Sequence, residues 1–285
     1  MLYIIFALLS ALFAAITSIL CKCGLKTADS DAATAVRTAV VLVFSWAIVF
    51  ITGAYHDIGS ITGHSLLFLI LSGCATGASW LFYFKALKYG DVSKVAPIDK
   101  SSVVLAMLMS FIFLGETLSI YKIAAMVLIA AGTLMMSVKR GGKKSKSNRW
   151  FFYAWLSAVF AALTSILGKI GVQDVNSNLG TAIRTIVVLV MAWLVVFAKG
   201  KKHVFSGLGS KNAVFIILSG VATGASWLCY YYALRIGDAS VVVPIDKLSI
   251  IPVIIFSRIF LKEKLSAPAF GGLVLIVAGT VLTLF

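Results

Sequence analysis

Only 12% of the 285 residues in this chain are charged, whereas 61% are hydrophobic, and the formal net charge is +15 at pH 7. A soluble domain carries about 25% charged residues, so this composition excludes an ordinary soluble fold and predicts an integral membrane protein. The basic residues stand at the ends of apolar segments, where membrane topology places them. The net charge therefore does not indicate a nucleic-acid partner.

The apolar residues form long, uninterrupted runs. A helix needs about 20 mostly apolar residues to cross about 30 Å of hydrocarbon. Alternating apolar and polar residues would indicate a membrane barrel, and these runs do not alternate, so we predict an all-α membrane protein. Ten stretches qualify as spans: 2–23, 34–53, 65–87, 94–114, 119–138, 150–170, 180–199, 212–234, 240–261 and 267–285. The first recurs at residue 150 and lacks a basic start, so we expect a span and not a removed signal.

One stretch occurs twice, at residues 71–80 and 218–227, which are 147 positions apart. The same spacing relates further residues along both halves of the chain, without insertion: Thr17 to Thr164, Lys22 to Lys169, Arg37 to Arg184, Trp46 to Trp193, Asp99 to Asp246, Glu116 to Glu263 and Gly132 to Gly279. The sequence therefore predicts two repeats of five transmembrane helices, 1–138 and 150–285, joined by a basic linker at 139–149.

Because five is an odd number of spans, the second repeat must enter the membrane in the direction opposite to the first. The charges give an independent indication of this inversion. The connections that follow the odd-numbered spans all lie on one side of the membrane. This side holds most of the basic residues, six of them in the linker 139–149, and the other side holds Lys122, Lys169 and Arg235. Because basic flanks stay cytoplasmic, we predict two inverted repeats in the cell (plasma or inner) membrane, with both chain ends outside the cytoplasm.

Ionisable side chains inside spans cost about 2.5–3.5 kcal/mol each near the helix centre, so each needs a reason. Four occur in each repeat: Lys22, Arg37, Asp99 and Lys100, and then Lys169, Arg184, Asp246 and Lys247. We expect the first set toward the inner face and the second toward the outer face, as gates of a cavity at the membrane midplane. The alternative for Lys22 and Arg37 is that they lie near helix ends and snorkel to the interface.

A proline precedes each aspartate by two residues, Pro97 before Asp99 and Pro244 before Asp246. Proline removes a backbone donor and frees a carbonyl, and discontinuous helices mark binding sites in transporters built from inverted repeats. We therefore predict a helix break at Pro97 and at Pro244. The neighbouring Asp-Lys pairs could be structural ion pairs, proton carriers or contacts to a charged substrate group, and the sequence leaves these alternatives open.

The repeated stretch adds polar and aromatic side chains at helical spacing. These residues are Thr76, Ser79, Trp80 and Tyr83 in the first repeat and Thr223, Ser226, Trp227 and Tyr230 in the second. Such a stripe suits a small polar or aromatic solute, or a cation over a ring; the competing interpretation is helix packing with intramembrane hydrogen bonds. Gly73 and Gly77, with their repeats, would permit close helix approach.

The sequence does not indicate an enzyme or a metal site. His56, His64 and His203 lie in or beside loops without the spacing of metal ligands, and no catalytic constellation or phosphate loop occurs. We expect no enzyme activity, no metal and no cofactor. Glu116 and Glu263 stand where the fourth and ninth spans end, and each is expected to cap the helix that follows it.

Taken together, two sets of five spans, Pro97 and Pro244, and the glutamates before Leu118-Ser119 and Leu265-Ser266 resemble EamA domains of the drug/metabolite transporter superfamily. Ala130-Ala131-Gly132 and Ala278-Gly279 in the last span of each repeat belong to the same resemblance. The resemblance implies a secondary transporter with a cavity between helices 1–4 and 6–9, and with helices 5 and 10 as support or oligomer contacts. Better-known members resemble a scheme with both ends in the cytoplasm, which differs from the orientation predicted here.

The resulting hypothesis is a secondary active transporter that moves a small polar metabolite, such as an amino acid, by alternating access. The expected partners are the substrate, membrane lipids and protons as coupling ion, with no nucleic acid. The first alternative is an exporter of organic cations or drugs, and the second is a channel or a non-transporting scaffold. We place the cation exporter second because the spans hold more cationic side chains than carboxylates.

Overall fold

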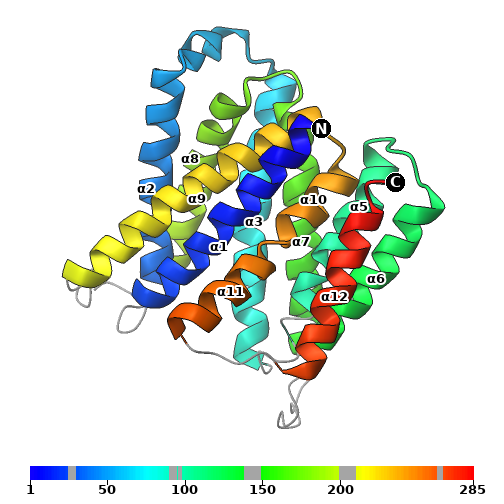
Figure 1. Ribbon diagram of the computed structural model, residues 1–285. Coiled ribbons are helices and arrows are strands. Elements are labelled where there is room, and N and C mark those ends of the chain that lie inside the picture. Colours follow the sequence, from blue (N-terminus) through cyan, green and yellow to red (C-terminus); the bar gives the residue numbers. More distant parts are fainter. Residues whose placement is uncertain (25–29, 90–94, 96–97, 138–148, 199–209, 262–265) are drawn as a thin grey trace.

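The computed structural model describes residues 1–24, 30–89, 95, 98–137, 149–198, 210–261 and 266–285, and the described part is almost entirely helical (Figure 1). In chain order the elements are α1 (Leu2–Gly24), α2 (Ser30–Ile51), the 3-10 turn η1 (Ala54–Ser60), α3 (Gly63–Tyr89), α5 (Ser102–Phe113), α6 (Ile120–Ser137), α7 (Arg149–Val172), α8 (Ser177–Ala198), α9 (Ser210–Ile236), α10 (Ala239–Lys247), α11 (Ile250–Leu261) and α12 (Ala267–Leu282).

Several of these helices are membrane spans by length and composition. Within the described residues, seven candidates qualify: Leu2–Cys21, Ala33–Ile51, Gly63–Leu87, Arg149–Val172, Ser177–Phe197, Asn212–Ile236 and Ala239–Phe256. The apolar helices Ile120–Met136 and Ala267–Leu282 are shorter. All nine coincide with predicted spans. The remaining one, 94–114, is only partly described; its described part includes helical residues 98–100 and the twelve-residue α5.

The ninth predicted span, 240–261, is divided into α10 and α11. Pro244 lies inside α10, and the break follows it at Leu248 and Ser249. Pro252 has no N–H to donate to the carbonyl of Leu248, which contributes to this break. The first repeat is interrupted at the equivalent place, at Ser101, although Leu105 stands where the second repeat has Pro252, so proline alone does not cause the break. The predicted break at Pro244 is therefore wrong by four residues, because Pro244 lies inside α10.

Helices of one half pack mainly on helices of the other. α1 lies along α9 and α3 along α7, while α2 packs on α9 and α3 on α8. The equivalent helices α2 and α8 also pair, as do α6 and α12. Glycines permit the close approach at matched points: a Cβ on Gly73 would lie 2.7 Å from Val187 Cβ, and one on Gly220 would lie 2.7 Å from Val40 Cβ. The 147-residue spacing thus relates contacts as well as sequences.

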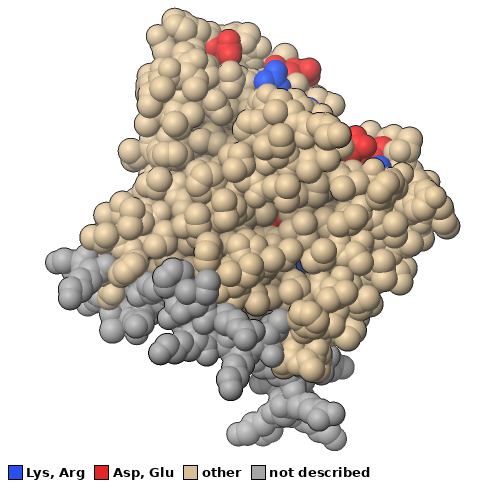
Figure 2. Space-filling view, in the orientation of Figure 1, with Lys and Arg blue, Asp and Glu red and all other residues tan. Residues whose placement is uncertain are grey.

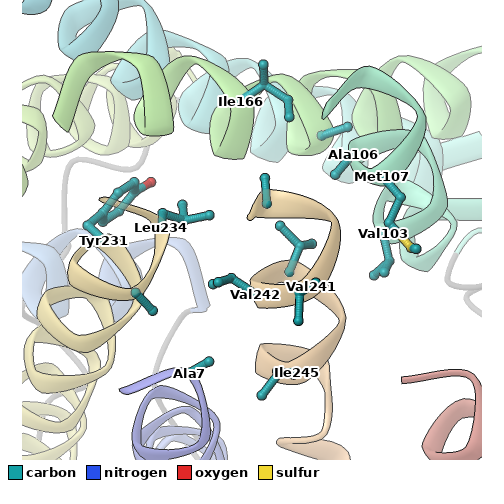
Figure 3. Packing of buried hydrophobic residues seen from close by; sticks show 14 of the residues in the cluster. Ala7, Val103, Ala106, Met107, Ile166, Tyr231, Leu234, Val241, Val242 and Ile245 are labelled. Atoms are coloured by element: carbon teal, nitrogen blue, oxygen red, sulfur yellow. The ribbon is translucent and has the colours of Figure 1, made fainter. Parts of the chain in front are cut away.

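The main hydrophobic cluster surrounds α10, which places this short helix at the centre of the molecule. Figure 3 shows its side chains between those of the neighbouring helices: Val241, Val242 and Ile245 of α10, with Ala7 of α1, Ile166 of α7, Tyr231 and Leu234 of α9, and Val103, Ala106 and Met107 of α5. Because α10 is fixed in this way, its last residues Asp246 and Lys247 hold a defined position near the middle of the helix assembly.

The surface is apolar over most of one face. Val43 is 71% exposed and Phe197 67% exposed, and Figure 2 shows acidic and basic atoms gathered mainly at the upper edge above a broad uncharged area. Both chain ends lie at this upper end (Figure 1). An exposed apolar surface of this extent fits a lipid environment, in which such side chains need no burial against protein.

Candidate functional site

A central cavity of about 380 Å³ lies between the two halves of the chain. Its volume is within the range of about 300–1,000 Å³ that is typical of small-molecule sites. The predicted site residues that line it are Arg37, Thr76, Ser79, Trp80, Arg184, Thr223, Ser226, Trp227, Tyr230, Asp246 and Lys247. Residues of the first repeat and their equivalents in the second therefore share one cavity wall.

Hydroxyl groups cross between the halves in matched pairs. Thr17 Oγ1 of α1 lies 3.3 Å from Thr223 Oγ1 of α9. At the equivalent place, Thr164 Oγ1 of α7 lies 3.3 Å from Thr76 Oγ1 of α3. Buried hydroxyls need hydrogen-bond partners, and each helix here supplies the partner for a helix of the other repeat. The cavity wall is therefore polar at its hydroxyls although the helices around it are apolar.

Asp246 belongs to a similar chain of polar groups. Ser10 Oγ donates to Asp246 Oδ1 at 2.6 Å and lies 3.1 Å from Ser226 Oγ. The equivalent carboxylate has the equivalent serine partner: Ser157 Oγ donates to Asp99 Oδ1 at 2.7 Å. Each aspartate at a predicted break is therefore held by a serine on the first helix of the opposite repeat. Lys247 Nζ lies 3.6 Å from Asp246 Oδ2, with the lysine side chain half exposed.

Arg184 is the most enclosed charge of the cavity, with 2% of the residue exposed. Its Nε donates to Ser72 Oγ at 3.0 Å, and its Nη2 donates to Thr76 Oγ1 at 2.6 Å. The guanidinium carbon lies 4.9 Å from the ring centre of Trp227 and 4.7 Å from that of Tyr231. These are cation–π distances, so the charge is held by two hydroxyls and two aromatic rings.

Arg37, the equivalent residue of the first repeat, has different surroundings. It is half-buried and lines the same cavity, and its Nη1 donates to Cys21 Sγ at 3.1 Å. A thiol is a weak acceptor compared with a hydroxyl. The two repeats therefore share residues but do not share conformation at this point.

Not all predicted site residues meet in the central cavity. Asp99 and Lys100 line a separate cavity of about 410 Å³ among α5, α6, α11 and α12, which Lys247 also borders. Tyr83 does not line either cavity, whereas its equivalent Tyr230 lines the central one and donates to Ser165 Oγ at 2.8 Å. The structure thus separates Asp99 from Asp246.

Lys169 lies in neither of these cavities but in a contact that links three elements. Its Nζ is 2.8 Å from Glu116 Oε1 and donates to the carbonyl of Gly237 at 2.9 Å. Glu116 also accepts from the backbone N–H groups of Ala239 and Ser240, at 2.6 and 2.9 Å. Glu116 therefore caps α10 of the other repeat and not α6, the helix that follows it. We call Glu116, Lys169 and the first turn of α10 the glutamate clasp.

The electrostatics of the glutamate clasp favour the charged carboxylate. Burial alone would raise the pKa of Glu116, but hydrogen bonds from Lys169 and Ser240 and the positive charge of Lys169 outweigh it, so the pKa lies below its ordinary value. The carboxylate also stands at the N-terminus of α10, where the helix dipole favours negative charge. Glu116 is therefore ionised at neutral pH.

Some expected residues lie outside the described part, and others were missed. Pro97, Glu263 and the side chain of Lys22 are not described. Ser10 and Ser157 were not singled out from the sequence, although they are polar residues within apolar runs and repeat at the same spacing of 147 positions. Among the described residues, no group of three or more His, Cys, Asp or Glu could hold a metal ion.

Comparisons with known proteins agree on a transporter family. A model described as the EamA-like transporter family matches residues 1–138 and 148–285. An "Uncharacterized transporter in cobO 3'region" of Sinorhizobium sp. is 48% identical over 136 residues, covering 48% of this chain and 96% of that relative. The "Uncharacterized transporter YxxF" of Bacillus subtilis (strain 168) is 26% identical over 210 residues, covering 72% of this chain and 66% of that relative.

The fold is also similar to one seen in solved structures. A structure described as "Crystal structure of protein" has a TM-score of 0.81 at 15% sequence identity, and the match covers 98% of this chain and 95% of that one. At this identity the similarity shows a common fold and nothing about the ligand.

Proposed function

The chain belongs to the EamA-like transporter family, and from that premise we propose that it is a secondary active transporter for a small polar metabolite, such as an amino acid or a related compound. The observation that carries the proposal is the central cavity. Equivalent residues of the two halves line it together: Thr76 with Thr223, Trp80 with Trp227, and Arg37 with Arg184. A site at the interface of two repeats is the usual arrangement in secondary transporters.

The proposal includes two inverted repeats, 1–138 and 150–285. α1 and α9 are antiparallel, because Ser10 contacts Ser226 while Thr17 contacts Thr223. The first and third spans of a repeat run in the same direction, and α9 occupies the third place in the second repeat. An α9 that is antiparallel to α1 therefore supports an inverted second repeat. The Sinorhizobium relative, of which 96% is matched by 136 residues of this chain, supports a five-helix unit.

We propose that alternating access moves the two halves against each other about this cavity. The glutamate clasp is one contact that such a movement would break, because Glu116 and Lys169 come from different repeats. The clasp joins the end of α5 to the start of α10 in the conformation described here.

Proton coupling is a further part of the proposal, and the aspartates are its carriers. Asp246 lies beside the cavity and accepts from Ser10, and Asp99 accepts from Ser157 in the equivalent place. Both carboxylates are partly buried, and ionisable residues in the interior of membrane transporters mark proton pathways. In proteoliposomes we expect Asp246→Asn to abolish the dependence of uptake on a pH gradient while retaining exchange of substrate.

The deciding experiment is transport by the purified protein in proteoliposomes, with a panel of amino acids and small organic acids, amines and sugars. Saturable uptake or exchange of at least one of these metabolites is the expected result. Ion-like conductance without saturation would favour a channel, and no flux together with no ligand-induced stabilisation would favour a scaffold. Either result would reject the transporter.

An exporter of organic cations is the weaker candidate. Such a substrate would use Asp246 and the faces of the cavity tryptophans. The ring of Trp227 is already engaged by the Arg184 guanidinium, at 4.9 Å. A cation in this cavity would also meet Arg37 and Lys247. We therefore place this function second.

Orientation and assembly complete the proposal. We place both chain ends outside the cytoplasm of a plasma or inner membrane, since basic connections stay inside. α6 and α12, the fifth span of each repeat, pair with each other and border the cavity that Asp99 and Lys100 line. We propose that they support the transporting helices and supply the contacts of any oligomer.

A further inference from the structure

We propose that the transported substrate carries a carboxylate or a similar small oxyanion, and that Arg184 binds this group. The inference rests on the proposed transport function, which it deepens by naming the chemical class of the substrate. Its basis is a buried cation whose hydrogen-bonding capacity is only partly used.

Arg184 lacks an acidic partner in the part of the chain that the structure describes. Its Nε and Nη2 each donate to a hydroxyl, whereas Nη1 is buried and has no hydrogen-bond partner among the described residues. No described carboxylate lies within ion-pair distance of it. A buried donor left unsatisfied costs stability, and more so for a charged group. The structure thus holds a cation that a bound anion would complete.

The geometry of the free donors matches an oxyanion. Both hydrogens of Nη1 and the second hydrogen of Nη2 are not used by Ser72 or Thr76. Adjacent guanidinium nitrogens form a planar fork that binds the two oxygens of a carboxylate or phosphate together. The hydroxyls and the rings of Trp227 and Tyr231 hold the guanidinium in place, so little side-chain entropy remains to be lost on binding.

The charge of the cavity favours the same class of substrate. Its described lining has three cationic residues, Arg37, Arg184 and Lys247, and one carboxylate, Asp246. Asp246 already accepts from Ser10 and lies 3.6 Å from Lys247. An anion entering this cavity is attracted in surroundings of low dielectric constant, whereas a bare cation is repelled. Arg37, from the other repeat, lies on the same wall and offers the anion a second cationic contact.

The test compares carboxylates with the corresponding amides, in which a neutral group replaces the carboxylate, on the purified protein. The probes are benzoate against benzamide and L-phenylalanine against L-phenylalaninamide, with inorganic phosphate as a separate arm. Binding is followed by the fluorescence of the tryptophans that line the cavity and by titration calorimetry. We expect saturable binding of the carboxylates at least about tenfold tighter than that of the amides, the gain typical of a charge-assisted hydrogen bond.

Variants assign the effect to this side chain. Arg184→Gln should remove the preference for carboxylate over amide, and Arg184→Lys, which keeps the charge without the fork, should retain part of it. The matched control is Arg235→Gln, because Arg235 is an exposed arginine near the end of α9 and should bind as the unchanged protein does. If Arg184→Gln fails to fold, Arg184→Lys decides: a carboxylate preference as large as that of the unchanged protein would overturn the inference.

The outcomes separate this inference from the transport proposal. Amides that bind as well as carboxylates, or a carboxylate preference that survives Arg184→Gln, would overturn the role of Arg184 even if uptake is observed. Binding of phosphate without any carboxylate would overturn an organic substrate. Carboxylate binding that depends on Arg184, in a protein that transports nothing, would uphold the anion site and reject the transporter.

Discussion

The glutamate clasp makes a sharp prediction about stability. Replacing Glu116 by alanine removes the acceptor of the Ala239 and Ser240 N–H groups and leaves the Lys169 ammonium with the Gly237 carbonyl as its remaining acceptor. The side chains of Glu116 and Lys169 are 5% and 9% exposed, so water cannot replace that acceptor without a rearrangement. Breaking a buried charge pair by removing one partner costs about 3–5 kcal/mol. We expect Glu116→Ala to lower the free energy of unfolding by that amount.

A double-mutant cycle isolates the contact itself. Lys169→Ala should cost less than Glu116→Ala, because Glu116 keeps two backbone donors. The double variant should be more stable than the sum of the single changes predicts, by at least about 1 kcal/mol, since residues in one network are coupled by about 0.5–3 kcal/mol. Chemical unfolding in detergent micelles, followed by circular dichroism, measures all three variants.

A half-exposed ion pair nearby supplies the comparison. Lys122 Nζ lies 3.6 Å from Asp238 Oδ2; the Lys122 side chain is 7% exposed and the Asp238 side chain 55% exposed. Asp238→Asn keeps an amide oxygen that can accept from Lys122, and water reaches the Asp238 side of the pair, so this change should cost less than Glu116→Ala. Equal losses for Glu116→Ala and Asp238→Asn, or strictly additive effects in the cycle, would refute the reasoning.

The same carboxylate predicts a pH dependence with a definite sign. The pKa of folded Glu116 lies below its ordinary value because Lys169 and the Ser240 amide outweigh the effect of burial. The stabilisation is therefore present above about pH 4.3, the pKa of an unperturbed glutamate, and is lost as the pH falls through the folded pKa. In Glu116→Gln, the free energy of unfolding should therefore fall less steeply as the pH is lowered. An unchanged dependence on pH would contradict the assignment of this stabilisation to Glu116.

Three further predictions concern packing, a buried donor and orientation. A Cβ on Gly132 would lie 2.5 Å from a backbone carbonyl of α12, so Gly132→Ala should cost about 1–3 kcal/mol by overpacking, whereas Gly59→Ala, with open space around it, should cost almost nothing in the same unfolding assay. Ser72→Ala removes the acceptor of Arg184 Nε and should cost about 1–3 kcal/mol in thermal unfolding; a neutral result would mean that the donor finds another acceptor. Alkaline phosphatase fused after Phe285 should be active, and a fluorescent protein that matures only in the cytoplasm should stay dark; the opposite pattern would reverse the predicted orientation.

Much of the architecture follows from composition and repetition. Long apolar runs can satisfy their backbone groups in a membrane only as helices or closed barrels, so the described helices coincide with predicted spans. The repeat at 147 positions identified Thr76 and Thr223, and Arg37 and Arg184, before any contact was known. Such properties are local or periodic, and the sequence by itself determined them.

Only the tertiary structure decided which polar groups meet. Lys169 and Glu116 are far apart in sequence, and their contact depends on how α7 packs beside α5 and α10. Equivalent residues also differ in surroundings: Arg184 is enclosed by hydroxyls and rings, whereas Arg37 is half-buried beside a thiol. The two repeats are similar in sequence, but in the folded chain equivalent residues have different neighbours. Similarity of sequence therefore cannot specify a conformation that is itself asymmetric.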